Sequence, residues 1–274
     1  MSVVLALILA TAAGPAKPAR VASLNLAADE VLVELVPPER LVGVTSWGDD
    51  PDSSNVAGRL PAGAVRFPKA DIERLVALRP DVVVVSEYTD ADAQRLLERS
   101  GLRTHRMEGL GTLAGIRAAI LRLGEVVGEP AAAQRLVASY DAKLAAVAAR
   151  LTGARRPRVL YWANPHTAGG DTTIGSLIEC GGGSNVGREL GLVGIQPVGA
   201  ERAFVAAPEV VLVGGVAGAA EAVTGHPLLA QLAAVREGRL VVMPTRLLVA
   251  LSQHAATSCE WLAGRLHPER FRKP

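Results

Sequence analysis

The chain has 274 residues, with 29 Lys and Arg against 27 Asp and Glu and a formal net charge of +2. This balance excludes a nucleic-acid partner and a polybasic membrane patch, because both would need a marked excess of basic residues. The length is on the long side for one hydrophobic core and predicts two domains of roughly 100 to 150 residues each.

The N-terminus carries the one long uncharged apolar stretch, residues 3–13, followed by small residues. The stretch is too short to cross a bilayer and is typical of a secretory signal peptide. We therefore expect residues 1–19 to be a signal peptide with a short N-terminal segment. No cysteine stands directly after the stretch, where a lipid-anchored product would carry one, so we expect a soluble periplasmic product without a lipid anchor. The stretch has no Lys or Arg before it, which leaves a misplaced start codon or a fortuitous apolar end as alternatives.

Strands and helices alternate through residues 20–128, which indicates an α/β lobe. After the first strand and helix, a strand is expected at 41–45 and a long surface loop at 47–68, because that segment is rich in Gly, Pro, Asp and Ser. Further elements follow to the end of the lobe: helices at 90–100 and 113–127, and a strand at 103–107.

One long helix is expected at residues 129–152, between the two halves of the chain. Pro130 stands where a first-turn proline is tolerated. The apolar residues that line one helix face are Leu136, Tyr140, Leu144, Val147 and Leu151. A rod of roughly 33 Å at about 1.5 Å per residue could run the length of a small domain. Because such a helix is stiff, we expect little closure of the two lobes on a ligand.

The second half, residues 153–274, repeats the order of the first. Residues 73–84 read ERLVALRPDVVV and residues 201–212 read ERAFVAAPEVVL. Each copy predicts a short amphipathic helix stopped by a proline, then a strand that is covered on both faces. The predicted fold is α/β, with two similar lobes, each a mainly parallel sheet flanked by helices. One long connecting helix joins the lobes, and a ligand cleft lies between them.

Ligand contacts are expected from loops that follow strands. Three of the nine aromatic residues follow strands in this way, Trp47, Tyr88 and Trp162, and they could stack on a flat ring system. The alternative for each is core packing.

Two histidines and an arginine are further candidates, His166, His254 and Arg246. An imidazole could make an axial contact to a chelated metal or hydrogen-bond a ligand, although most single histidines do neither. Arg246 could pair with a carboxylate or phosphate, or could be exposed and unused.

Cys180 and Cys259 are the only cysteines. An even count in an exported chain favours a disulfide, while two buried free thiols are the alternative. Neither cysteine has a second thiolate or histidine at metal-ligand spacing.

The order of motifs resembles the helical-backbone (class III) periplasmic binding proteins, which serve ABC importers of vitamin B12, ferric siderophores and haem. The resemblance runs from Arg20 to Phe271. The runs that carry it are RVASLNLAADE at 20–30, PPERLVGV at 37–44, both repeat copies, IECGGGSN at 178–185 and LHPE at 266–269. It is strongest to the vitamin B12 binders, whose two cysteines match Cys180 and Cys259, so it implies a disulfide between them.

The resemblance also implies function. We expect a monomeric binding protein with no cofactor of its own that carries a cobalt corrinoid or a ferric chelate to an ABC importer. Glu73 and Glu201 match the glutamates that dock onto the permease dimer, where two related carboxylates would meet two basic sockets. The alternative for each glutamate is a solvated surface charge.

Other functions are weaker. No P-loop, zinc-protease or nucleophile-elbow motif occurs, so an exported two-lobed enzyme such as a metal chelatase is an alternative only in a generic sense. A bare zinc or manganese receptor would need several histidines, and only His166 and His254 lie in expected cleft loops. A haem receptor of the same fold is the third alternative.

Overall fold

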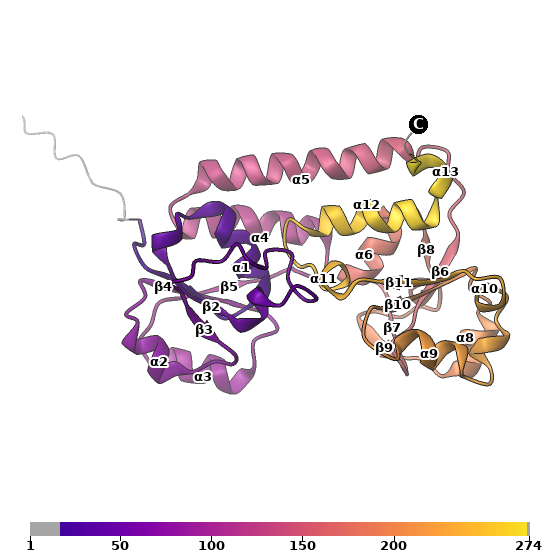
Figure 1. Ribbon diagram of the computed structural model, residues 1–274, viewed down its shortest axis with the longest axis horizontal. Coiled ribbons are helices and arrows are strands. Elements are labelled where there is room, and N and C mark those ends of the chain that lie inside the picture. The colour runs from indigo at the N-terminus through magenta and orange to yellow at the C-terminus, as the bar shows by residue number, and fades with distance from the viewer. Residues whose placement is uncertain (1–16, 273–274) are drawn as a thin grey trace, which may run out of the picture.

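The computed structural model describes residues 17–272 (Figure 1). The expected signal peptide therefore lies almost wholly outside the described residues. Among residues 17–272, no helix is long and apolar enough to cross a membrane.

The N-terminal lobe is built on a five-stranded parallel sheet in the order β3-β2-β1-β4-β5. Its strands are β1 (Val21–Ser23), β2 (Leu41–Thr45), β3 (Val65–Phe67), β4 (Val82–Ser86) and β5 (Thr104–Met107). Its helices are α1 (Leu26–Leu35), α2 (Ile72–Ala77), α3 (Ala91–Arg99) and α4 (Leu113–Val126), with short 3₁₀ turns η1 (Pro38–Arg40) and η2 (Ser46–Asp49). Strand β3 lies inside the expected loop 47–68, so the prediction of an unbroken loop there is wrong. Strand β3 has only three residues, too few for the alternation of side chains in a strand to be recognised in the sequence.

The continuous apolar run of β4 is explained by burial on both faces of the sheet. Val82 and Val84 pack into one core with α1 and α4. Val83 and Val85 pack into another with Leu75 of α2 and Leu97 of α3. Successive strand residues point to opposite faces, so a strand covered twice needs apolar residues at every position.

The C-terminal lobe has a four-stranded parallel sheet in the order β11-β10-β6-β8. Its strands are β6 (Arg158–Tyr161), β8 (Ser184–Asn185), β10 (Val210–Gly214) and β11 (Leu240–Met243). A separate antiparallel pair joins β7 (His166–Ala168) to β9 (Ile195–Pro197). The helical elements are α6 (Thr173–Cys180), α7 (Val186–Glu189), α8 (Ala200–Val205), α9 (Ala219–Thr224), η3 (Leu229–Gln231), α10 (Ala233–Arg236), α11 (Thr245–Leu248), α12 (Ala255–Leu266) and α13 (Pro268–Phe271).

The sequence repeat corresponds to a structural repeat. Strand β10 has the neighbours that β4 has in the other sheet, and helices α2 and α8 precede the two strands. Even the turn is shared, since Arg79 and Ala207 adopt φ of +47° and +45° directly before a proline. A left-handed residue after a helix, followed by proline, ends the helix and redirects the chain into the strand.

Two helices, not one, pack in the hydrophobic cores of both lobes. The expected connecting helix is α5 (Pro130–Arg150), whose N-terminal half packs in the N-terminal core and whose Val147 packs in the C-terminal core. Helix α12 does the same, with Ala255 and Ala256 in the first core and Cys259 and Leu262 in the second. The second bridge was not predicted.

The disulfide between Cys180 and Cys259 is confirmed, with a Cα–Cα distance of 5.8 Å. It ties α6 of the C-terminal lobe to the middle of α12, so the second bridging helix is covalently anchored to that lobe.

We expect replacement of both cysteines by serine to lower the free energy of unfolding by about 4 kcal/mol. The disulfide closes a loop with a sequence separation of 79, and the chain-entropy cost of such a loop in the unfolded state is of that size. Denaturant unfolding with and without reductant measures the loss. Reductant should have no effect on the double variant, and equal stability of oxidised and reduced wild type would contradict the prediction.

Candidate ligand cleft

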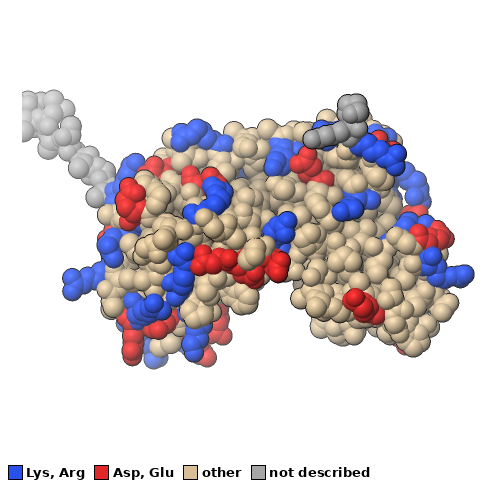
Figure 2. All heavy atoms as spheres, in the orientation of Figure 1, with Lys and Arg blue, Asp and Glu red and all other residues tan. Residues whose placement is uncertain are grey.

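Two hollows, both lined in part by α11, lie between the lobes, where the parallel strands end. Tyr88 follows β4, Gly215 follows β10 and Pro244 follows β11. This is the edge at which open α/β sheets bind ligands. The space-filling view shows the notch between the two lobes (Figure 2).

The first, which we call the apolar hollow, has a volume of about 400 Å³ and is lined by Tyr88, residues 171–174, Gly194, Ile195, Leu248, Val249 and Leu251. Three of its large apolar side chains are well exposed, Tyr88 at 62%, Ile195 at 50% and Val249 at 45%. Such side chains gathered in a concave site mark a surface that a ligand can cover.

The floor of the cleft is a contact between the lobes. Thr173 Oγ1 donates to the carbonyl oxygen of Leu110, at 2.7 Å and buried. Beside it, a Cβ on Gly111 would lie 2.9 Å from the carbonyl oxygen of Asp171. Only glycine lets the two backbones approach this closely, so the loop before α4 and the loop before α6 meet at a fixed distance.

The loop before α4 is itself held by Glu87, the neighbour of Tyr88. The Glu87 carboxylate accepts hydrogen bonds from the backbone N–H of Leu110, at 2.7 Å, and of Gly109, at 3.3 Å. The segment that presents Tyr88 to the apolar hollow is therefore joined to the floor of the cleft.

The second, which we call the polar hollow, has a volume of about 430 Å³ and is lined by Asp52, Ser53, residues 215–217 and residues 244–246. Arg246 is exposed there, and its guanidinium makes no hydrogen bond or ion pair with any residue from 17 to 272. Its backbone, by contrast, is fixed to the N-terminal lobe, because its N–H donates to Asp52 O at 2.9 Å and its carbonyl accepts from Asn55 Nδ2 at 2.8 Å. A free cation on an anchored backbone is suited to an anionic ligand group.

Only some of the residues predicted to contact a ligand line the two hollows. Tyr88 lines the apolar hollow, and Arg246 lines the polar hollow. Trp47, 57% exposed, stands in η2 directly after β2, at the same edge of the sheet, and lines neither hollow. His166 is exposed on β7 and also lines neither.

The expectation that Trp162 faces the cleft is wrong. Its backbone N–H continues the strand ladder to Leu212 O, at 2.8 Å, one residue beyond β6. Its side chain therefore points to the same face as that of Leu160, and it is only 4% exposed in the core with Val186 and Val211.

His254 stands at the start of α12, packed toward α1 and not in either hollow. Burial lowers the pKa of its imidazole, with Glu30 and Glu34 opposing that effect. Its Nε2 is buried without a partner among residues 17–272. Its neutral form is favoured, and it does not line the site where a ligand would meet it.

Several lining residues escaped sequence reasoning, among them Asp52, Ile195, Val216 and Val249. Residues 215–217 could have been found, since they follow β10 as Tyr88 follows β4 in the repeat. Ile195 and Val249 carry no such signal, because β9 and α11 are too short to be recognised.

The two repeat glutamates lie away from the cleft. Glu73 and Glu201 are the second residues of α2 and α8, both exposed. Neither forms an ion pair within residues 17–272. The two helices lie on one side of the molecule, and α5 and α12 lie on the other (Figure 1).

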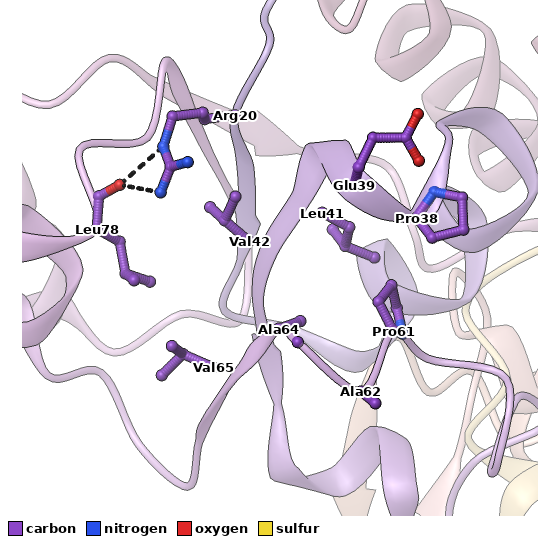
Figure 3. Close-up of a pocket in the computed structure, with 11 residues that line it drawn as sticks. Arg20, Pro38, Glu39, Leu41, Val42, Pro61, Ala62, Ala64, Val65 and Leu78 are labelled. Carbon is purple, nitrogen blue, oxygen red and sulfur yellow. Dashed lines mark hydrogen bonds between the residues drawn. The ribbon is translucent and has the colours of Figure 1, made fainter.

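A further hollow of about 500 Å³ lies at the opposite edge of the N-terminal sheet (Figure 3). Arg20, Glu39 and Ala64, which line it, precede strands β1, β2 and β3. Its one cation is already engaged, because Arg20 Nε and Nη2 both donate to Leu78 O, at 3.0 and 2.8 Å. The carboxyl-end cleft is therefore the better candidate.

Comparison with known proteins decides the family. Residues 21–247 match the family described as periplasmic binding protein. The chain belongs to this family. The family and the relatives named below are substrate-binding transport proteins, so the chelatase alternative has no counterpart among them.

Two kinds of relative are similar to this periplasmic binding protein. A cobalamin-binding protein of Halobacterium salinarum is 28% identical over 227 residues, which is 80% of this chain and 60% of that protein. The chain thus spans about 60% of the length of the curated relatives it matches.

Among solved structures, the periplasmic haem-binding protein BhuT, in complex with two haems, is 28% identical with a TM-score of 0.75, covering 92% of this chain and 98% of BhuT. A periplasmic haem-binding protein from Pseudomonas aeruginosa is 24% identical with a TM-score of 0.77, covering 94% and 95%. Because its identity is only 24%, the similarity to the Pseudomonas aeruginosa protein supports a shared fold and nothing more.

One buried acid beside the cleft should give this binding protein a pH-dependent stability. Asp29 Oδ2 accepts from the N–H of Thr45, at 3.0 Å, and from its hydroxyl, and burial raises the pKa of Asp29 from 3.8 to about 7. Between these values the folded state holds a proton that the unfolded state has lost. The contribution of Asp29 to the free energy of unfolding therefore falls as pH rises from about 4 to about 7, by on the order of 4 kcal/mol.

We expect Asp29→Asn to flatten this slope, measured by chemical denaturation across that pH range. Glu98→Gln, an exposed acid on α3, is the control and should leave the slope unchanged. An unchanged slope in Asp29→Asn would contradict the prediction.

Proposed function

We propose that this protein captures a cobalamin-type metal chelate in the cleft and delivers it to an ABC importer in the inner membrane. The observation that carries the proposal is the pairing of an apolar hollow with a polar hollow that contains a free arginine. A corrinoid has a broad, largely apolar face and, in cobalamin, an anionic phosphodiester. The corrinoid face would cover Tyr88, Ile195 and Val249, and the phosphodiester would pair with Arg246.

The cobalamin-binding relatives support this ligand class. Haem is the second candidate, because it is also flat and anionic and because BhuT is as similar in sequence. Ferric siderophores, which lack a rigid flat ring, would use the apolar hollow less fully.

Delivery would use the surface of α2 and α8. Glu73 and Glu201 lie at equivalent positions of the repeat, with exposed apolar residues beside them, Val76 and Phe204. Two carboxylates related in this way can meet two related basic sites of a permease dimer, which gives orientation and speed of encounter.

We expect cyanocobalamin to bind one to one in isothermal titration calorimetry, and Arg246→Ala to weaken it by roughly tenfold or more. Loss of a hydrogen bond to a charged group costs about 1.5 to 3 kcal/mol. Arg99→Ala removes another exposed arginine, from α3, and should bind as the wild type does. Parallel titrations with a ferric siderophore, haemin, Zn²⁺ and Mn²⁺ separate the alternatives. Binding of the free ions alone would contradict the proposal.

We expect the double variant Glu73→Ala/Glu201→Ala to bind cyanocobalamin normally but to support its uptake roughly tenfold more slowly, because docking loses its charge complementarity. Glu98→Ala/Glu221→Ala is the matched control, with one exposed glutamate from α3 and one from α9. Uptake of radiolabelled cyanocobalamin by cells that depend on this protein gives the measurement. A loss of ligand affinity in the first variant would instead place the repeat in the binding site.

A further inference from the structure

Glu30 of α1 is a buried residue with hydrogen bonds to two other segments, the loop at Asn55 and residues 252–253. It is 2% exposed. Its Oε1 accepts from the backbone N–H of Asn55, at 2.8 Å, and from Asn55 Nδ2, at 2.9 Å, and its Oε2 accepts from the hydroxyl of Ser252. Its backbone carbonyl accepts from Gln253 Nε2 at 2.7 Å. A buried carboxylate is tolerated only when its oxygens are satisfied in this way.

Asn55 connects Glu30 to the backbone of Arg246. An amide group has two N–H donors, and Asn55 Nδ2 donates to both Glu30 Oε1 and the carbonyl oxygen of Arg246. The N–H of Arg246 donates to Asp52 O in the same loop. Both polar atoms of the Arg246 backbone are therefore held by residues 52–55, and that loop is held by Glu30.

Helix α11 cannot fix Arg246 by itself. It has four residues, from Thr245 to Leu248, and no side-chain cap at its N-terminus. A single helical turn is unstable alone, since few of its hydrogen bonds are internal. The position of the Arg246 guanidinium must come from contacts with other segments, and the polar ones to its backbone come from the opposite lobe.

We infer that Glu30 is a positioning residue for Arg246 and sets the preference of the cleft for an anion-bearing ligand. The ligand part of this inference rests on the proposed function. Glu30 touches no ligand in this scheme. It acts through Asn55, so that the guanidinium stands over the polar hollow in a fixed place, and preorganisation of this kind favours a ligand with a matching charge.

Asp29 provides a comparison within the same helix. It is also fully buried, and its carboxylate holds Thr45, the last residue of β2, ten residues before Asn55. It makes no contact with residues 52–55 or with Arg246 in the hydrogen-bond network of residues 17–272. A substitution of Asp29 therefore removes a buried carboxylate without breaking the connection to Arg246, so it serves as the control for substitutions of Glu30.

The test compares two corrinoids, cyanocobalamin, which carries the phosphodiester, and dicyanocobinamide, which has the same ring without it. We expect Glu30→Ala and Asn55→Ala to weaken cyanocobalamin by about tenfold and dicyanocobinamide by less than about twofold. Glu30→Gln should bind within about threefold of the wild type, because its amide can accept from Asn55 and donate to Ser252. Asp29→Asn should not change the ratio of the two affinities.

A double-mutant cycle makes the inference specific. In an Arg246→Ala background, Glu30→Ala should weaken cyanocobalamin by less than about twofold more, because the group it positions is gone. Additive losses, or equal weakening of both corrinoids by Glu30→Ala, would overturn the inference. Asn55 is partly exposed, so Asn55→Ala replaces Glu30→Ala in the cycle if Glu30→Ala does not fold.

Hydrogen exchange tests the same connection without a ligand. We expect backbone amides in residues 245–250 to exchange at least about tenfold faster in Glu30→Ala and Asn55→Ala, but not in Glu30→Gln or Asp29→Asn. If the wild type binds neither corrinoid, the proposed function fails while this measurement still decides the positioning role. Unchanged exchange in both alanine variants would overturn it.

Discussion

The relative position of the two lobes depends on two helices that belong to both hydrophobic cores. In α5 and α12, one half of the apolar face packs in the N-terminal core and the other half in the C-terminal core. Leu144 of α5 and Leu113 of α4 contact both cores, and Lys143 Nζ donates to Thr257 Oγ1 at 2.8 Å between the two bridging helices. Rotation of one lobe against the other would expose apolar surface in either core. We expect that cost, more than the stiffness of a single helix, to limit closure of the cleft.

Polar contacts add to this constraint on both sides of the cleft. Thr173 bonds to Leu110 at its floor, and Arg246 bonds to Asp52 and Asn55 beside the polar hollow. The candidate cleft is therefore largely preformed. A preformed site loses little conformational entropy on binding, so modest contacts in an open cleft can give useful affinity.

Much of the architecture is predictable because it produces long or repeated patterns of apolar residues in the sequence. The runs at β4 and β10, the helix α5 and the repeat of α2 in α8 are visible in the sequence, since each depends on burial periodicity within one element. The elements that were missed, such as β3, β9 and α11, have three or four residues and are held by tertiary contacts. Trp162 was misplaced because the ladder to Leu212 extends one residue past β6, which turns the side chain into the core.

The site was only partly predictable for a related reason. Arg246 could be chosen as a cation near a strand end, but its anchoring depends on Asn55, 191 positions earlier in the chain. Nothing in the local sequence of either residue signals the other. The two adjacent acids of α1 show how such distant parts are joined. Asp29 holds the start of residues 45–55 through Thr45. Glu30 holds the other end of that segment through Asn55, which also binds Arg246. One turn of a buried helix thus fixes both ends of residues 45–55, the segment that bears Trp47, and it connects that segment to the only part of the opposite lobe that presents a free cation to the polar hollow among residues 17–272.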